Sequence, residues 1–118
     1  MTLAASPVPH PTFGGKYAII AASSSGATQV VAPVMGYAIV CVCYNYMANG
    51  TVNVKFQSYN AGTSTSTDIS GLGYYAVNTG KVVPFSAVGW FKTNIGEALN
   101  INLSANVAVG GELVFCLM

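Results

Sequence analysis

The chain has 118 residues, a length that suits one domain with a single hydrophobic core. Charged residues make up 6% of it and hydrophobic residues 53%, against a charged share of about 25% in ordinary soluble domains. The net charge is +1 and no arginine is present, so there is no basic stripe to neutralise phosphates, and we expect no nucleic acid as a direct partner.

The mean hydropathy of +0.54 raises the question of a membrane span. The candidate, residues 30–44, is shorter than the ~20 apolar residues that a bilayer requires and contains Pro33 and Gly36. No Lys or Arg cluster flanks it, and the N-terminus lacks the charged region and apolar run of a secretory signal. We therefore expect no membrane partner.

Residues 1–15 are predicted to form an extended arm. Prolines alternate with other residues there, and this spacing favours polyproline-like backbone and forbids a helix. A free terminal tail is the plain alternative, but we favour contact with a neighbouring subunit or a larger assembly. The candidate contact residues of the arm are Pro7, Val8, Pro9, His10, Pro11 and Phe13.

The next part of the chain is predicted to form strands separated by turn residues. A first strand is expected over Lys16–Ala22 and a second over residues 28–32, which Pro33 ends. Residues 37–47 form the longest candidate strand. Because both of its parities are apolar, it is predicted to be central and covered on both faces.

Asn49 and Gly50 then give the strongest short hairpin signal in the sequence. The returning strand, residues 52–57, alternates apolar and polar side chains. Residues 59–70 are rich in Ser, Thr, Asn and Gly and are expected to be a loop, with a short strand near Asp68. An edge strand is predicted within residues 71–77.

The C-terminal part begins with a short strand at residues 81–83, stopped by Pro84. Residues 99–104 alternate strictly between apolar and polar side chains, as in a strand with one buried and one wet face. A polar turn at residues 93–97 predicts a hairpin whose other arm is Trp90 and Phe91. Both aromatics are expected to be core or interface anchors.

A last strand is expected over residues 112–117, after a turn near Asn106. Many short strands and no stretch of helical period predict an all-β protein, a single-domain antiparallel β-sandwich of jelly-roll type. The predicted organisation is an extended N-terminal arm over residues 1–15 and a sandwich domain over residues 16–118.

The residues available for catalysis are few. The single histidine, His10, lies in the proline-rich arm with no carboxylate or nucleophile near it in sequence. The carboxylates are Asp68, Glu97 and Glu112, and the last two stand in a turn and at a strand start, where exposed charges are usual. We predict that the protein is not an enzyme.

The three cysteines give no strong metal signal. Cys41 and Cys43, two residues apart, are expected on one strand face. A zinc site would need two more ligands, and only Cys116 and His10 remain. We therefore expect free, buried thiols and neither a metal nor a cofactor.

The aromatic residues allow two interpretations. Flat rings with abundant asparagines could form a sugar-binding face on a sandwich, and the same residues suit subunit interfaces, where Tyr and Trp are enriched. The scarcity of charge favours the interface. The residues in question are Tyr44, Tyr46, Tyr59, Tyr74, Tyr75 and Trp90.

Several runs in the C-terminal two-thirds resemble one group of virion proteins, the decoration or cement proteins of tailed-bacteriophage heads. These runs are VNVKFQS at 52–58, DISG at 68–71, VPF at 83–85, GWFKT at 89–93, GEALNINLS at 96–104 and VGG at 109–111.

The resemblance implies a β-sandwich that forms a homotrimer, is made in the host cytoplasm and ends in the virion, on the outer surface of the phage head. There it would bind the major capsid protein and bridge neighbouring capsid subunits. A trimeric tail or fibre-associated virion protein and a carbohydrate-binding β-sandwich module are the alternatives.

Overall fold

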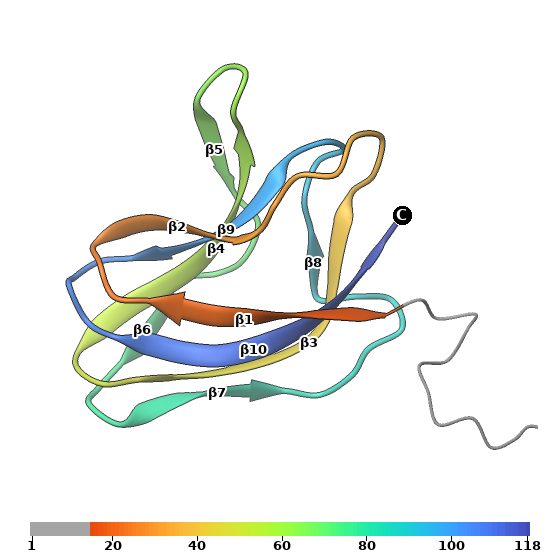
Figure 1. Ribbon diagram of the computed structural model, residues 1–118. Coiled ribbons are helices and arrows are strands. Elements are labelled where there is room, and N and C mark those ends of the chain that lie inside the picture. Colours follow the sequence, from red (N-terminus) through yellow and green to blue (C-terminus); the bar gives the residue numbers. More distant parts are fainter. Residues whose placement is uncertain (1–14) are drawn as a thin grey trace, which may run out of the picture.

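The computed structural model describes residues 15–118, so nearly all of the predicted arm lies outside the described residues. The described part is all-β and consists of two antiparallel sheets of five strands each (Figure 1). It contains no helix long and apolar enough to cross a membrane.

The sheet that we call the β3 sheet has the order β1-β10-β3-β7, with β8 also paired to β3. Its strands are β1 (Lys16–Ala22), β10 (Val109–Leu117), β3 (Ile39–Ala48), β7 (Thr79–Val83) and β8 (Phe91–Lys92). The β4 sheet has the order β2-β9-β4-β5, with β6 also paired to β4. Its strands are β2 (Gly26–Val31), β9 (Ala98–Leu103), β4 (Val52–Asn60), β5 (Thr65–Asp68) and β6 (Gly73–Tyr75).

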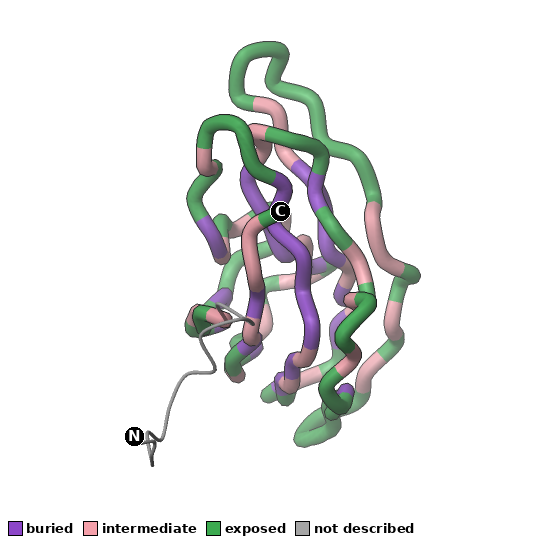
Figure 2. The backbone as a smooth tube through the Cα atoms, turned by 90° about the vertical axis from the view of Figure 1, so that its right-hand side faces the viewer, coloured by how far each residue is buried: buried purple, intermediate pink, exposed green. Residues whose placement is uncertain are grey.

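The core lies between the two sheets, and both contribute to it. Figure 2 shows the buried positions along the inner strands and the exposed positions mainly in loops. Alternation along each strand sends every second side chain into this layer. The largest fully buried side chains are Phe56, Ile20, Ile39, Leu99, Ile101, Leu103 and Leu113. This arrangement confirms the prediction of a β-sandwich.

Several predicted strands are found where the sequence pattern put them. β1 has the predicted bounds, and β3 is an inner strand whose residues Val40, Cys41 and Val42 are all buried. Val40 packs against the backbone of Gly89, where an added Cβ would lie 2.5 Å from Val40 Cγ1. Pro84 follows directly after β7, as expected.

Both predicted hairpins are wrong in their pairing. Asn49 and Gly50 do join β3 to β4, but these strands lie in opposite sheets and do not pair. Phe91 likewise pairs with β3, whereas β9 pairs with β2 and β4. Alternation of apolar residues reports which face is buried but not which sheet a strand joins, and a turn between sheets uses the same residues as a hairpin turn.

Residues 59–70 are more ordered than the predicted loop. β4 continues to Asn60 and forms a hairpin with β5, in which Gln57 pairs with Asp68 and Asn60 with Thr65. The polar composition of β5 is consistent with its full exposure at a sheet edge.

In each sheet, one edge consists of two short strands with a non-strand segment between them, and we call it the interrupted edge. Along β3, the edge is shared by β7 and β8, which the segment 84–90 separates. Along β4, it is shared by β5 and β6, which residues 69–72 separate. β1 and β2 form the opposite edges.

A register shift in the β3–β10 pair changes which face the β3 side chains occupy. Val114 pairs with Cys43 and the next residue, Phe115, pairs with Cys41, so one step along β10 matches two along β3. Cys41 packs in the core, and Cys43 does not. The prediction that the two cysteines share a face is therefore wrong, because a bulge breaks the alternation. All three cysteines are free, but only Cys41 is fully buried, and burial raises the pKa of its thiol to about 12.

Candidate functional site

An aromatic cleft opens between the sheets at the interrupted edge. Its volume is about 380 Å³, within the range of about 300–1,000 Å³ usual for ligand pockets. The β3 sheet contributes Tyr44, Tyr46, Lys81, Trp90 and Phe91. The β4 sheet and the segment between β5 and β6 contribute Phe56, Tyr75 and residues 69–73.

Aromatic side chains that pack on one another form the floor of the cleft. Phe91 stacks on Phe56 with centroids 4.7 Å apart, and Tyr44 meets both rings at 5.6 and 5.4 Å. Tyr46 lies 5.9 Å from Tyr44 in a stacked arrangement. Such contacts add to the free energy of burial and hold the ring orientations.

A tyrosine pair crosses the gap between the sheets. The hydroxyls of Tyr46 and Tyr75 are 2.7 Å apart and hydrogen bond to each other, and the rings meet edge to face at 5.4 Å. Burial raises the pKa of Tyr46, and the contact with Tyr75 raises it further. Gly73 makes room for this pair, since a Cβ there would lie 2.5 Å from the Tyr75 hydroxyl oxygen.

One cation lies at the cleft. The ammonium nitrogen of Lys81 is 5.9 Å from the centroid of the Tyr44 ring, within reach of a cation–π interaction. Burial raises the pKa of Tyr44, and the nearby Lys81 opposes that rise. No carboxylate lines the cleft among the described residues.

Trp90 stands at the rim of the cleft. Its side chain is 49% exposed, and its indole Nε1–H donates to the Pro84 carbonyl at 2.8 Å. The tryptophan is therefore not a core residue, whereas Phe91 is half-buried and packs against the core. The interface alternative for Trp90 stays a prediction.

A second candidate surface is the outer face of the β3 sheet, which we call the apolar face. Cross-strand pairing puts Ile19, Glu112, Asn45 and Val82 in one row across four strands. The exposed fractions are 78% for Tyr17, 72% for Ile19, 58% for Met47 and 82% for Val82. Large apolar side chains gathered on one exposed face are a common feature of interaction sites.

The apolar face ends in a hollow of about 590 Å³. Ala21 and Gly110 pair across β1 and β10, and Gly110 pairs with Met47 on β3. Small side chains in this row leave space beside Met47, and Asn49 and Asn78 also line the hollow.

A third group of exposed apolar side chains, the apolar end, consists of Met35, Tyr37, Ile95 and Met118. Backbone hydrogen bonds bring its segments together: Ala38 exchanges bonds with Met118 at 2.9 and 3.0 Å, and the Gly96 amide donates to Tyr37 at 2.9 Å. β1 begins near this end, because Lys16 pairs with Phe115. The predicted arm therefore joins the domain close to the apolar end.

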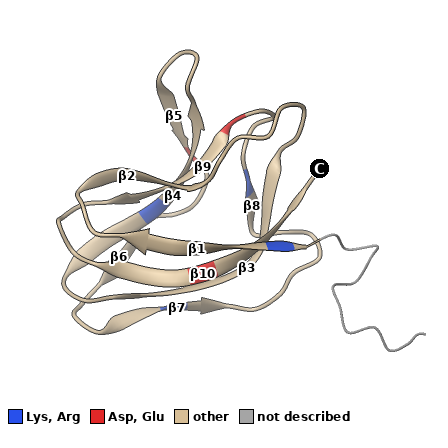
Figure 3. Cartoon of the chain, in the orientation of Figure 1, with Lys and Arg blue, Asp and Glu red and all other residues tan. Residues whose placement is uncertain are grey.

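The charged residues are scattered over several strands, with Glu97 just before β9 (Figure 3). Glu97 accepts a hydrogen bond from the Ser58 hydroxyl at 2.6 Å, and Glu112 is exposed on the apolar face. Within residues 15–118, no group of three or more His, Cys, Asp or Glu side chains could hold a metal ion.

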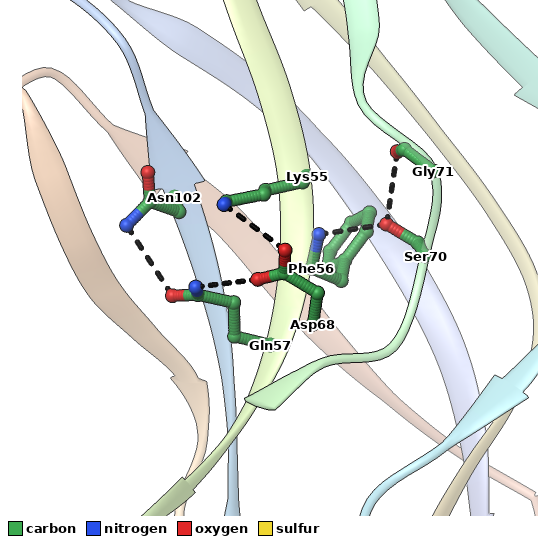
Figure 4. A network of polar contacts seen from close by, with 7 residues as sticks. All are labelled: Lys55, Phe56, Gln57, Asp68, Ser70, Gly71 and Asn102. Carbon is green, nitrogen blue, oxygen red and sulfur yellow. Dashed lines mark hydrogen bonds and ion pairs between the residues drawn. The ribbon is translucent and has the colours of Figure 1, made fainter. Parts of the chain in front are cut away.

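The outer face of the β4 sheet is polar instead. Figure 4 shows Asp68 accepting from Gln57 at 2.8 Å and pairing with Lys55 at 3.2 Å, while Asn102 donates to Gln57 at 3.3 Å. The hydrogen bond from Gln57, followed by the Lys55 contact, lowers the pKa of Asp68. Asn100, next in the same row, is only 7% exposed, and its Oδ1 has no hydrogen-bond partner.

The structure divides the aromatic residues singled out in the sequence. Tyr44, Tyr46 and Tyr75 meet inside the cleft, with Trp90 at its rim. Tyr74 instead pairs with Asn53 and is exposed. These aromatic residues therefore do not all lie on one face, and the carbohydrate-binding alternative stays a prediction.

Sequence reasoning missed the apolar face and the role of Lys81. The sequence does contain a signal for the apolar face. In Lys16–Ala22 apolar side chains alternate onto both faces of the strand, although β1 is an edge strand. No signal marks Lys81, since its position depends on which sheet β7 joins. Of the predicted site residues, Pro7, Val8, Pro9, His10, Pro11 and Phe13 lie outside the described residues.

Comparisons of the chain with family models, with curated proteins and with solved structures find no match.

Proposed function

We propose that the protein is a structural virion protein, a decoration protein that binds the major capsid protein on the outside of a tailed-phage head and stabilises the lattice. The observation that carries the proposal is the apolar face, where Tyr17, Ile19, Met47 and Val82 are exposed with two charged residues, Glu112 among them and Lys92 at the β8 edge. Together with the sequence runs that resemble decoration proteins, it favours a protein that functions through assembly.

The physical requirements of such a role agree with the chain. A decoration protein needs a rigid shape and many repeated contacts, so that individually weak sites add through multivalency. The low share of charged residues suits a subunit whose surface is covered by other subunits. The strand orders β1-β10-β3-β7 and β2-β9-β4-β5 support a jelly-roll assignment, with two four-stranded paths wound together.

Two surfaces receive different partners in this proposal. The apolar face is the contact between copies of a homotrimer, because large apolar side chains are exposed across its strands and charged residues are few. The apolar end, beside the start of β1, faces the capsid, and the arm extends from there toward neighbouring subunits.

Charge insertion separates the two contacts. The double variant Ile19→Lys/Val82→Lys should abolish the trimer in sedimentation velocity, since lysines would be buried against apolar side chains. The double variant Met35→Lys/Ile95→Lys should keep the trimer and lose co-sedimentation with phage heads stripped of their decoration protein. Thr67→Lys, on the exposed strand β5, is the control and should change neither. A wild-type protein that is monomeric and does not bind heads refutes the proposal.

A carbohydrate-binding function is the second candidate. Tyr74 is 76% exposed and pairs with Asn53 on the polar outer face of the β4 sheet, where amides and one ion pair lie nearby. Flat rings stack on sugars and amides bind hydroxyl groups. Binding on a glycan array that Tyr74→Ala abolishes, with no head binding, would favour this candidate over decoration.

A further inference from the structure

We propose that the aromatic cleft of one copy binds the proline-rich segment, residues 7–11, of a second copy. The inference deepens the proposed function by assigning a partner to the arm, and it rests on that function only in requiring that copies of the chain associate.

The chemistry of the cleft fits a polyproline segment. Proline-rich chains dock in grooves lined by aromatic rings, because the extended helix is preformed and its rings pack flat on aromatic faces. Tyr75 and Trp90 are in position for this role, and the buried ring of Tyr44 lies beneath them in the floor of the cleft. Its one aliphatic rim residue with substantial exposure, Leu72, adds apolar area.

The hydrogen-bonding groups of the cleft also match those of a proline-rich segment. Proline lacks an amide N–H, so a segment such as Pro-Val-Pro-His-Pro presents mainly carbonyl acceptors. The cleft supplies donors in the Lys81 ammonium group and in one hydroxyl of the Tyr46–Tyr75 pair, since the other hydroxyl donates within the pair. Residues 1–14 contain no Lys, Arg, Asp or Glu, so neither charge repulsion nor the burial of a second charge opposes docking.

The position of the arm points to a second copy. The arm joins β1, which is the edge strand opposite to β7 in the β3 sheet. Three strand spacings of about 4.8 Å separate these edges, which is about 14 Å. Four residues from Gly15 to Pro11 span at most about 14 Å when fully extended.

A path within one copy must be longer than that. The direct line between the edges passes through packed strands, so the arm would have to cross an outer face and then turn around β7 or β8 into the cleft. If instead the arm at the β1 edge of one copy docks in the cleft at the opposite edge of the next copy, the contact is head-to-tail. Such a contact closes into a ring when the rotation between copies allows it.

Disulfide trapping tests the contact. Two proteins with different tags, one with Val8→Cys and one with Leu72→Cys, are mixed and mildly oxidised, each with Cys43→Ser and Cys116→Ser. The cross-linked pair should form at least about tenfold more than for Val8→Cys with Thr67→Cys, because docking raises the effective concentration of the thiols. Thr67 is an exposed position on β5, outside the cleft.

A matched peptide gives an independent measurement. A peptide of residues 1–15 should change the fluorescence of Trp90 in a protein that lacks residues 1–14, and a peptide with alanine in place of Pro7, Pro9 and Pro11 should not. No change with the native peptide overturns the assignment of the cleft.

Two further outcomes decide the case. If Val8→Cys cross-links to Leu72→Cys no more than to Thr67→Cys, the arm of a second copy does not dock in the cleft. The same conclusion follows if a chain that carries both Val8→Cys and Leu72→Cys forms the disulfide only within itself. A trimer that binds heads but shows no trapping refutes the arm contact and leaves the decoration role standing. Trapping without head binding refutes the decoration role and leaves the arm contact standing.

Discussion

Asn100 combines burial with an unsatisfied acceptor, in the middle strand of a polar row. Its Oδ1 is the one buried side-chain oxygen or nitrogen in residues 15–118 without a hydrogen-bond partner. A buried unsatisfied group costs about 1–3 kcal/mol. We expect Asn100→Val to raise the free energy of unfolding by about 1 kcal/mol in urea denaturation, since valine also suits a strand.

Asn102→Val is the matched control on the same strand and face. It removes the hydrogen bond to Gln57 and should leave the free energy of unfolding unchanged or lower it. A clear loss of stability in Asn100→Val would show that the Asn100 amide makes a contact that valine cannot replace.

Tyr46 gives the fold a dependence on alkaline pH. Its pKa is raised in the folded state by burial and by Tyr75, whereas in the unfolded chain it is about 10. A raised folded pKa stabilises the fold fully below the unfolded pKa, and this contribution is lost as the pH rises above it. The free energy of unfolding should therefore fall as the pH rises beyond about 10.

Removing the hydroxyl isolates this contribution. Tyr46→Phe should cost about 1 kcal/mol at neutral pH, from the lost hydrogen bond, and flatten the alkaline decline. Tyr74→Phe also removes one tyrosine hydroxyl, but at an exposed position, and should not lower the free energy of unfolding at neutral pH. An equally steep decline in Tyr46→Phe would assign the pH dependence to other groups, of which Cys41, with its raised pKa, is the first to examine.

Among the elements, the pairing of β10 with β3 requires glycine at one position. A Cβ on Gly111 would lie 2.0 Å from the Asn45 carbonyl oxygen and 2.6 Å from Tyr46 Cα, both on the neighbouring strand. Gly111→Ala should lower the free energy of unfolding by about 3 kcal/mol, since backbone must move.

The preceding residue is the natural comparison. At Gly110 the nearest atom to an added Cβ is the Ile20 carbonyl oxygen at 3.8 Å, an ordinary contact. Gly110→Ala should change stability by less than about 1 kcal/mol in the same thermal or urea measurement. Equal losses in the two variants would argue against close approach of the strands at Gly111.

The sequence predicted the strands better than their partners. The bounds of β1, the inner position of β3 and the end of β7 at Pro84 follow from local pattern. Local pattern does not show to which sheet each strand belongs, because Asn49-Gly50 can turn a chain between sheets as well as within one. The bulge that separates Cys41 from Cys43 is likewise set by pairing with β10.

The candidate site was predictable only in its residue types. Tyr44, Tyr46, Tyr75 and Trp90 stood out in the sequence, but their meeting at one edge depends on β6 and β7 lying opposite each other. Phe91 was expected beside β9 and instead packs on Phe56 from the β3 sheet. Long-range pairing is not encoded in local alternation.

At the scale of the whole molecule, charge and apolar area are distributed in a way that suits assembly. The few charged residues form one ion pair, Lys55–Asp68, and otherwise lie scattered, while large apolar side chains are exposed on the outer face of one sheet and at one end. A domain that functioned alone would expose this area to solvent at the risk of aggregation. The proposed trimer and its capsid contact cover both surfaces.

Under the proposed decoration role the chain is encoded by a tailed phage, and the most direct test of the proposal is electron cryo-microscopy of virions of that phage. We expect three-fold clusters of this β-sandwich on the outer surface of the head, with the apolar faces meeting around each three-fold axis. Density for the protein on the tail or fibres, or its absence from purified virions, would contradict the proposal.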